Sequence, residues 1–493
     1  MDPVLEASKE LLYFIIREQP IYPAEQGIED EIREAARAVL DAQSQIPSSM
    51  IGEDTARQLS ELKTLAHEKL YEVDFKDVAE CWRVLFADTS TLQALNVLTI
   101  KFLENGDETW LGKLLSLLDV GSIMSGGPCG RKAATDKFLS VLEHWYLTCR
   151  LPLEADYVEL MDKSASIRHD RWPAVDRRSA RPVVEYPVER QDNVTMEDFQ
   201  AHLERTGADG PMPLLISHSI GHWPAIENRT WQRPAYFLSR TFGGRRMIPI
   251  ETGRSYVDED WGQQILSFRE FIENYIVERS REYDAPHHVG YLAQHDLFTQ
   301  FHSLRADICI PDFVYTDPPP PQPGRPLHGK YRDNEIPKLS EPQMNAWIGP
   351  AGTITPLHTD PYHNILCQVV GRKYVRLYGP TQTPELYPRG IDELGIDMSN
   401  TSKADVGLEL LREEPTAHDG DDDGRRFHAR AEPARRWDDD GRRELQEELF
   451  PLLQDARYVE TILEEGDCLY VPVEWWHYVE SLSTSMSVSF WWN

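Results

Sequence analysis

Two residues in the C-terminal half, His358 and Asp360, have the types and spacing of metal ligands. They lie two positions apart in Gly352-Thr-Ile-Thr-Pro-Leu-His-Thr-Asp, a run whose Thr, Ile and Leu favour an extended backbone. Side chains at i and i+2 of a strand point to the same side, so an imidazole and a carboxylate converge from one face. A further histidine would complete the two-histidine, one-carboxylate triad that binds non-haem Fe(II) and leaves coordination positions open.

The third ligand should come from a separate strand, and His477 is the candidate. A Gly-Asp turn leads into the apolar stretch Cys468-Leu-Tyr-Val, and a proline separates this stretch from His477 and its aromatic neighbours. Because Asp360 and His477 are far apart in the chain, the fold must return distant strands side by side, as a double-sheet jelly roll does. A second such pair, His202-Leu-Glu204, follows a capping-box-like helix start, and positions i and i+2 of a helix do not share a face. We therefore expect no metal there.

Four segments of the C-terminal half follow one another along the chain. They are Asn345-Ala-Trp-Ile-Gly-Pro continuing to His358-Thr-Asp360, Gly371-Arg-Lys-Tyr-Val-Arg-Leu-Tyr, Val471-Pro continuing to His477, and Ser487-Val-Ser-Phe-Trp-Trp. In this order they resemble the JmjC oxygenases, and within them the branch of lysine-specific demethylases and JmjC protein-arginine hydroxylases. The likeness extends from about Val183 to Asn493. It implies a cupin-like double-stranded β-helix, with Fe(II) as cofactor, 2-oxoglutarate as cosubstrate and O2 as oxidant.

A lysine in the second of these segments falls on an apolar strand face, because Lys373 and Val375 share one side. A buried ammonium is costly unless an anion meets it, and a cosubstrate carboxylate is the candidate. The alternative is a lysine that extends along the apolar surface to solvent at the rim. The resemblance implies that Lys373 pairs with the far carboxylate of 2-oxoglutarate, and that Thr355, Tyr291 and Asn364 also contact the cosubstrate.

The resemblance further implies that Glu251, Trp347 and Trp491 face the substrate. Glu251 follows a short apolar strand, and a carboxylate there could bind a guanidinium through two hydrogen bonds. A glutamate exposed at a strand end is the alternative. Trp347 and Trp491 would line the mouth of the site, unless they are core residues. Serines alternate with larger residues over 485–490, and small inward-facing side chains would leave room for a cosubstrate.

The reaction implied by the resemblance is oxidation of a C–H bond in a protein, coupled to conversion of 2-oxoglutarate to succinate and CO2. Hydroxylation of an arginyl side chain leaves an alcohol, whereas hydroxylation of a lysine N-methyl group releases formaldehyde and demethylated lysine. Glu251 favours the arginyl hydroxylase, and a histone methyl-lysine demethylase is the alternative. A non-catalytic JmjC binding module is a second alternative, which the complete metal triad and Lys373 argue against.

Helical periodicity in the first half predicts a separate domain, because apolar residues recur at spacings of three and four over 3–163. We predict an α+β protein with an all-helical N-terminal domain at 1–165, a basic, proline-containing linker at 166–190, and a JmjC catalytic domain at 191–493. Within the catalytic domain, residues 403–448 form a charged insert with few apolar residues, and we expect much of it to be mobile.

Composition limits the partners and the location of this 493-residue chain. Its formal net charge of −31, from 82 acidic and 51 basic residues, disfavours direct binding to nucleic acid and favours a basic protein or peptide substrate. The six cysteines include no C-x-x-C pair, which indicates reduced thiols and an intracellular location, nuclear or cytoplasmic. No apolar run approaches the length of a membrane span and no signal peptide is recognisable, so we expect no membrane association. The sequence carries no signature of an oligomeric state.

Overall fold

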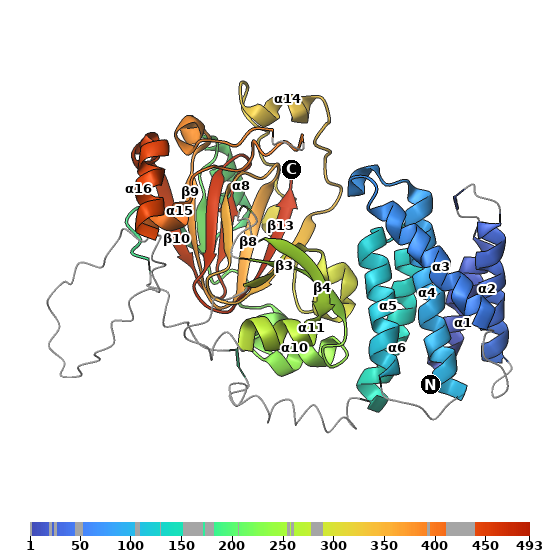
Figure 1. Cartoon of the computed structure of the whole chain (residues 1–493). Helices are drawn as coiled ribbons and strands as arrows, with labels where there is room; N and C mark the ends of the chain where they lie inside the picture. The colour runs from blue at the N-terminus through green and yellow to red at the C-terminus, as the bar shows by residue number, and fades with distance from the viewer. Residues whose placement is uncertain are drawn as a thin grey trace. The chain divides into compact units, whose positions relative to one another are not determined.

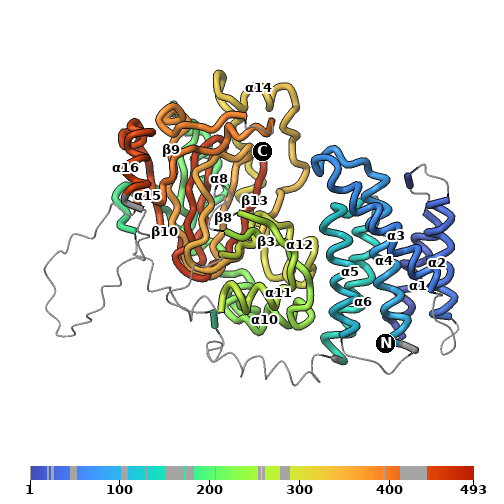
Figure 2. Tube along the Cα trace, in the orientation of Figure 1, coloured from blue at the N-terminus to red at the C-terminus, as the bar shows by residue number. Residues whose placement is uncertain are grey.

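The computed structural model divides into two compact units, one helical and one built largely of strands (Figures 1 and 2). The helical unit comprises Met1–Ala165, Ala235–Pro249 and Ile265–Ile272, and the barrel unit comprises Ser166–Pro234, Ile250–Gln264 and Glu273–Asn493. Nothing in the sequence pattern indicates that two segments beyond residue 190 join the helical unit. The structure describes residues 2–18, 22–23, 27–44, 53–103, 109–128, 130–150, 171–172, 182–205, 207–253, 257, 261–277, 289–391, 395–410 and 439–493.

The N-terminal part of the helical unit is built of long helices around one apolar core, as the spacing of apolar residues predicts. Leu59, Leu62, Ala66 and Leu70 are buried along one helix at spacings of three and four residues. The elements are α1 (Asp2–Arg17), α2 (Ile28–Ser44), α3 (Glu53–Leu70), η1 (Phe75–Asp77), α4 (Glu80–Leu103), α5 (Trp110–Ser125), α6 (Arg131–Trp145) and η2 (Tyr146–Arg150). Helix α4 packs against α1, α2, α3, α5 and α6 and is therefore the centre of the bundle.

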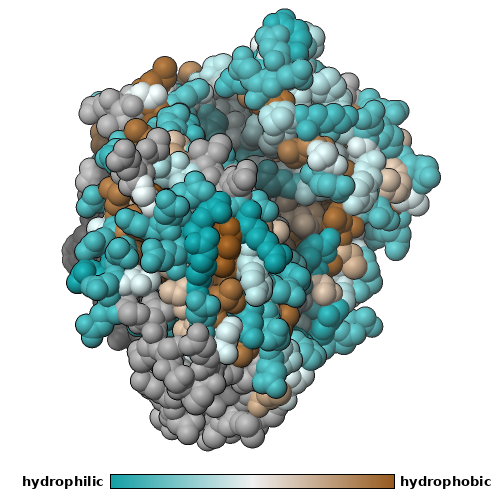
Figure 3. All heavy atoms as spheres, turned by 90° about the vertical axis from the view of Figure 1, so that its right-hand side faces the viewer, coloured by the Kyte–Doolittle hydropathy of each residue, from teal (hydrophilic) through white to brown (hydrophobic). Residues whose placement is uncertain are grey.

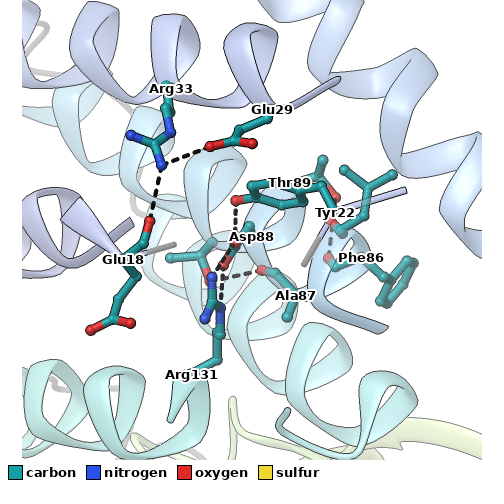
Figure 4. A network of polar contacts seen from close by, with 11 residues as sticks. Glu18, Tyr22, Glu29, Arg33, Phe86, Ala87, Asp88, Thr89 and Arg131 are labelled. Carbon is teal, nitrogen blue, oxygen red and sulfur yellow. Dashed lines mark hydrogen bonds and ion pairs between the residues drawn. The ribbon is translucent and has the colours of Figure 1, made fainter. Parts of the chain in front are cut away.

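A buried ion pair links two of these helices (Figure 4). The Asp88 carboxylate of α4 accepts hydrogen bonds from the Arg131 guanidinium of α6 at 3.0 and 3.2 Å, and from the Tyr22 hydroxyl at 2.6 Å. Asp88 is fully buried and Arg131 is 5% exposed. Removing one partner of such a pair leaves an uncompensated charge in the core, at a cost of about 3–5 kcal/mol.

The two later segments of the helical unit are tied to its core and to each other. The ring of Phe242 lies 5.1 Å from that of Tyr146 and belongs to the same apolar cluster as the helices. The Phe268 N–H donates to the Arg246 carbonyl at 2.8 Å, which joins one segment to the other. Their elements are α10 (Pro234–Arg240), the first half of strand β3 (Met247–Thr252), the end of strand β4 (Gly262–Ser267), α11 (Phe268–Glu270) and the start of η4 (Phe271–Val277).

The barrel unit contains the predicted double-sheet jelly roll. The remaining strands are β1 (Glu189–Asp192), β2 (Leu214–Ser217), β5 (Gly290–His295), β6 (Gln343–Gly349), β7 (Ile354–His358), β8 (His363–Val370), β9 (Lys373–Tyr378), β10 (Tyr458–Leu463), β11 (Cys468–Val471), β12 (Trp476–Ser481) and β13 (Ser485–Trp492). In the described chain, one sheet has the order β1-β2-β11-β8-β13-β6-β5-β3-β4 and the other the order β10-β9-β12-β7. From β6 to β13 the chain alternates between the two sheets, except at the β9–β10 pair, which is the connectivity of a jelly roll.

Alternate strand residues face an apolar interior between the sheets, among them Leu366 of β8 and Val375 and Leu377 of β9. The turn between these two strands requires a glycine. Gly371 has a φ of 72°, and a Cβ there would overlap the Thr484 carbonyl oxygen. Because Gly371 keeps the turn tight, β9 starts inside the barrel at Lys373.

The chain segment just before β1 lies against β10. The backbone of residues 186–188 pairs with Glu460 of β10. The buried Glu460 carboxylate accepts the Glu185 N–H at 2.6 Å, the Arg376 guanidinium at 3.2 Å and the Tyr374 hydroxyl. The described end of the predicted linker is therefore fixed to the smaller sheet.

Both ends of the charged insert at 403–448 are folded. Helices α15 (Val406–Leu410) and α16 (Asp439–Leu449) lie beside β10 in Figures 1 and 2. Gln446 of α16 exchanges hydrogen bonds with the backbone of Asp405 at 2.8 and 3.1 Å. The expectation of mobility concerns most of the insert, and residues 411–438 lie outside the described residues.

Short helices make the other connections: α8 (Met196–Glu204), α9 (Pro224–Glu227), α12 (Leu297–Gln300), α13 (His302–Arg305), η6 (Asp312–Tyr315), α14 (Pro326–Arg332), η7 (Pro380–Leu386) and η8 (Pro451–Asp455).

On the face shown in Figure 3, hydrophilic atoms predominate and apolar atoms form narrow, separate strips. Among the described helices, none combines the length and the apolar character that crossing a membrane requires.

Candidate active site

The three predicted metal ligands converge where β7 and β12 meet. These strands pair with His358 directly opposite His477, and the two ring centroids are 4.2 Å apart. The Oδ1 of Asp360 is 3.6 Å from His358 Nε2, and its Oδ2 is 3.5 Å from His477 Nε2. One ligand atom from each residue lies within 4.8 Å of the other two, a spacing at which one metal ion could be shared.

Asp360 reaches the histidines from a turn and not, as predicted, from the strand. Strand β7 ends at His358, and the Thr359 N–H donates to the Asn400 carbonyl at 2.8 Å instead of continuing the ladder. Pro361 follows, and proline has no N–H with which to extend a strand pairing. The strand alternation therefore describes only the first ligand of this pair.

Both imidazoles are held in the orientation that metal binding needs. His358 Nδ1 is 2.8 Å from the Pro356 carbonyl oxygen, and His477 Nδ1 is 3.0 Å from that of Trp475. An Nδ1–H that donates to a carbonyl leaves the lone pair on Nε2, the atom that faces Asp360. Burial, with the neighbouring His477, lowers the pKa of His358 to about 4, so this imidazole is neutral at pH 7. Burial opposes ionisation of Asp360, but the His477 hydrogen bond and the two histidines hold its pKa below the usual value.

Lys373, the first residue of β9, faces the interior, as the alternation of side chains along the strand predicts. It is 2% exposed, and its ammonium donates to the Tyr291 hydroxyl at 3.1 Å. No carboxylate in the described part of the chain pairs with it, and burial lowers its pKa to about 7. A buried cation without an anion is costly, so the donor set at this point fits an anionic ligand.

Two aromatic rings form a wall beside the Lys373 ammonium. Its Nζ lies 5.5 Å from the ring centroid of Tyr291 and 6.0 Å from that of Trp347, and the two rings are 6.0 Å apart. The Trp347 indole donates to Ser489 Oγ at 2.9 Å, so this serine holds a side chain as well as leaving space. Tyr291 also shares a hydrogen bond with the Thr355 side chain. Residues predicted from three separate segments are thus in one place.

The lysine and the metal triad lie at different depths of one strand pair. Strands β9 and β12 pair so that Lys373 is opposite Ser481 and Leu377 is opposite His477. The two pairs are four positions apart along the strands, which corresponds to roughly 13 Å along the sheet. This arrangement suits an elongated ligand with a polar group at each end.

Two buried amides on the opposite sheet have unpaired atoms. Asn345 Nδ2 and Asn364 Oδ1 have no hydrogen-bond partner in the described chain, and the two residues are 2% and 6% exposed. Across β13, Asn345 pairs with Ser489 and Asn364 pairs with Trp491, so both amides share the face of Trp347. Buried polar atoms without a partner are rare, and these two are available to a ligand bound between the sheets. Asn364 was predicted as a cosubstrate contact, whereas Asn345 was missed although it opens a JmjC-like segment.

Trp491 lies beside the turn that carries Asp360. Its ring centroid is 6.0 Å from that of Tyr362, and its buried indole N–H has no partner in the described chain. The predicted mouth residue is therefore mostly buried, with a donor left for a ligand.

Glu251 is half-buried on the same face as Tyr291. Strands β3 and β5 pair antiparallel with these two residues directly opposite, and such side chains share a face. Burial raises the pKa of Glu251, and a hydrogen bond with the Trp261 side chain opposes this shift. Glu251 is therefore not the exposed strand-end residue that the alternative predicted. Trp261, 36% exposed, was missed because the residues on its N-terminal side show no strand pattern.

The second His-x-Glu pair lies on a helix, as predicted. It lies in α8, which begins with a capping box between Thr195 and Asp198. His202 Nε2 is 2.8 Å from the Met212 carbonyl oxygen. His202 is thus a buried histidine bonded to the backbone.

Comparisons with known proteins fit this geometry. Residues 200–493 match the cupin-like domain family. The chain is 30% identical over 457 residues to lysine-specific demethylase JMJ30 of Arabidopsis thaliana, an alignment that covers 90% of this chain and 87% of the plant protein. The chain belongs to the JmjC family of oxygenases. As a JmjC protein, it is a 2-oxoglutarate-dependent dioxygenase.

Two animal JmjC proteins extend the comparison. Lysine-specific demethylase 8 of Danio rerio is 36% identical over 286 residues, which are 58% of this chain and 54% of the fish protein. Jumonji C domain-containing protein 5 of Drosophila melanogaster is 29% identical over 378 residues, 76% of each chain. The plant and fly alignments are longer than the barrel unit alone, so the likeness includes part of the helical unit.

Proposed function

We propose that His358, Asp360 and His477 bind Fe(II), and that 2-oxoglutarate binds between this metal and Lys373. Two imidazoles and one carboxylate on a single side leave the other coordination positions open. When bound, iron and 2-oxoglutarate supply the oxidation: the cosubstrate becomes succinate and CO2 while an oxygen atom of O2 enters a C–H bond. The protein orients these groups and excludes water.

The far carboxylate of 2-oxoglutarate would bind Lys373, with the Tyr291 and Thr355 hydroxyls beside it. This contact gives the buried ammonium an anion that the described part of the chain does not provide. The amide of Asn364, which keeps an unpaired atom in the same interior, would contact the cosubstrate between its two ends.

We propose that the oxidised residue of the substrate is an arginine in a basic protein. The observation that carries this proposal is Glu251, a half-buried carboxylate directly opposite Tyr291 in the β3–β5 pair. A planar guanidinium can donate two parallel hydrogen bonds to such a group. No basic side chain in the described chain pairs with Glu251, so its charge is left for the substrate.

Methyl-lysine demethylation is the second candidate, because the plant and fish relatives carry the name lysine-specific demethylase. A methylated ammonium is recognised mainly by aromatic faces. Trp261 and Trp347 would then be the determinants, and the charge of Glu251 would matter little.

Mass spectrometry of peptides containing arginine or methyl-lysine separates the candidates. Wild type, Glu251→Gln and a control, Glu341→Gln, are each incubated with iron, 2-oxoglutarate and peptide; Glu341 is an exposed acid before β6. Gain of one oxygen on arginine, reduced at least tenfold in Glu251→Gln and kept in Glu341→Gln, is expected for the loss of a charge-assisted contact. Loss of a methyl group with formaldehyde release, indifferent to Glu251→Gln, would refute arginyl hydroxylation.

A further inference from the structure

A strained residue of the barrel unit lies in the loop before β12 and contacts a metal ligand. Glu474 has a φ of 66°, which is unfavourable for any residue with a side chain larger than that of glycine. Its N–H donates to the Asp360 carbonyl at 3.4 Å, and His477 follows three positions later. The residue is 7% exposed. Strained residues persist where the surrounding structure holds them, so the contacts of this buried side chain show what the strain serves.

The Glu474 carboxylate caps a helix that is distant in the sequence. Its Oε1 accepts the Leu327 N–H at 2.8 Å, in the first turn of α14. Arg325, at the N-cap position of α14, makes no side-chain capping hydrogen bond of its own. A carboxylate at this end of a helix satisfies a free backbone donor and is favoured by the helix dipole. Glu474 therefore supplies, from 147 positions away, the cap that the segment itself lacks.

The other end of α14 is bonded next to Asp360. The Tyr331 hydroxyl donates to the carbonyl of Pro361, and it shares a hydrogen bond with the side chain of Asn493. Figures 1 and 2 show α14 at the end of the barrel where the chain terminates. This helix has seven residues and buries none of them completely, so it is too short and too exposed to be stable by itself. The polar contacts at its two ends, all within the barrel unit, therefore determine where it lies.

These contacts hold α14 at the open end of the proposed metal site. The side chains of His358 and Asp360 are 12% and 13% exposed, whereas Lys373, at the other end of the proposed cosubstrate site, is 2% exposed. With 2-oxoglutarate between the metal and Lys373, a C–H bond has to reach the metal from the exposed side. Tyr331 is bonded beside Asp360, so a peptide that approaches this ligand passes next to α14.

We infer that Glu474 is a positioning residue for substrate binding: by capping α14 it holds this helix where it forms one wall of the peptide entrance. The left-handed backbone directs the N–H of Glu474 to Asp360 and its carboxylate to Leu327. The inference rests on the proposed function in one respect, that a peptide is oxidised at this metal. It does not depend on whether the oxidised residue is arginine or methyl-lysine.

The test compares Glu474→Gly with a matched control, Asn193→Gly. Glycine adopts this φ without strain and keeps the N–H to Asp360, but it removes the carboxylate that caps α14. Relief of strain and loss of the cap oppose each other, so the variant should unfold in urea close to the wild-type midpoint. Asn193, an exposed residue with a φ of 53°, undergoes the same backbone change elsewhere in the barrel unit. Mn(II) affinity should be that of wild type in both variants.

Kinetics with the arginine peptide, or with the methyl-lysine peptide if that one is oxidised, measure the effect on binding. Glu474→Gly should raise the KM for the peptide by up to about fivefold and leave kcat unchanged, because loss of a cap lowers the fraction of molecules with α14 in place. A fall in binding alone appears in KM and not in kcat. Asn193→Gly should keep the wild-type KM.

Hydrogen exchange of the α14 amides reports the same helix without turnover. In protein loaded with Mn(II) and 2-oxoglutarate, residues 327–332 should exchange faster in Glu474→Gly than in wild type, and added peptide should slow their exchange in wild type. Equal KM values for Glu474→Gly and Asn193→Gly, or α14 amides that do not respond to peptide, would overturn the inference and leave the proposed function intact. If wild type oxidises neither peptide, the proposed function fails and the inference fails with it.

A second variant acts on the other end of α14 and covers the case in which Glu474→Gly does not fold. Tyr331→Phe removes the hydrogen bond to the Pro361 carbonyl and keeps the ring. It should also raise the KM for the peptide and speed exchange of the α14 amides, whereas Tyr186→Phe, at an exposed tyrosine of the barrel unit, should do neither. A wild-type KM in Tyr331→Phe, with exchange of α14 accelerated, would show that the place of α14 does not matter to the substrate and would refute the positioning role.

Discussion

Replacing Lys373 by methionine tests the cosubstrate half of the site. The change removes the buried ammonium and keeps an unbranched apolar chain, so the barrel should remain packed. A hydrogen bond to a charged group contributes about 1.5–3 kcal/mol, which corresponds to roughly a ten- to 150-fold weaker binding of 2-oxoglutarate. Tyr291→Phe removes only a neutral hydroxyl from the same carboxylate, about 1 kcal/mol or roughly fivefold. Both side chains would contact the same carboxylate. The difference in 2-oxoglutarate affinity between the two variants therefore measures the contribution of the lysine charge.

The pH dependence of cosubstrate binding follows from the same lysine. Burial lowers the pKa of Lys373 to about 7 in the free site, and a bound carboxylate raises it again by favouring the charged form. Above pH 7 the free lysine is largely neutral, so binding takes up a proton and the affinity falls by up to about tenfold per pH unit. Below pH 7 the lysine is already charged and this dependence disappears. Lys373→Met should abolish the proton uptake.

Both effects are measured by titration calorimetry of 2-oxoglutarate into the protein loaded with Mn(II), which prevents turnover. Runs at pH 6 and pH 8 in buffers of different ionisation enthalpy report the number of protons taken up. Mn(II) affinity itself should be the same for wild type and Lys373→Met, because Lys373 is no metal ligand. An unchanged affinity for 2-oxoglutarate in Lys373→Met, or proton uptake that persists in it, would refute the reasoning.

Two further predictions concern the metal and the stability of the barrel. His358→Ala or His477→Ala should abolish Fe(II) binding in equilibrium dialysis and all 2-oxoglutarate turnover, whereas His202→Ala, in the other His-x-Glu pair, should bind iron as wild type does; iron retained by both site variants would exclude the triad. Glu460→Ala should lower the free energy of unfolding by about 3–5 kcal/mol in urea denaturation, because it leaves the Arg376 guanidinium without this buried carboxylate. The exposed Glu448→Ala is the matched control, and an equal effect of the two changes would contradict the burial argument.

The sequence supports inferences about the site wherever the chemistry depends on local periodicity. Strand alternation is enough to direct Lys373 inward, because the side-chain period of two is a property of the backbone. The apolar run before Glu251 likewise predicts its strand. The family resemblance brings His358 and His477 together, which no local rule could do. Asp360 shows the limit of periodicity, since strand β7 ends at His358, two residues before this ligand.

Contacts between residues distant in the sequence account for most of what could not be predicted. Asp119 and Arg246 form an ion pair although they are 127 positions apart. Neither residue departs from the pattern of its own segment. The two later segments of the helical unit, Ala235–Pro249 and Ile265–Ile272, could not be assigned to it from the sequence either. Their short helices and strands show no local pattern that points to the N-terminal helices. Asn345 stands out only in the structure, where its amide nitrogen is buried and has no partner among the described residues. In the sequence, a polar residue that faces a ligand site cannot be distinguished from any other polar residue.

Tyr291 connects the two halves of the proposed site. Its hydroxyl accepts a hydrogen bond from the Lys373 ammonium, and its backbone is paired with that of Glu251 on β3. Burial and the nearby charge of Glu251 both raise the pKa of Tyr291, so its hydroxyl remains protonated and can donate to a carboxylate at any physiological pH. The proposed contacts with the cosubstrate and with the substrate therefore lie on one strand pair, β3–β5.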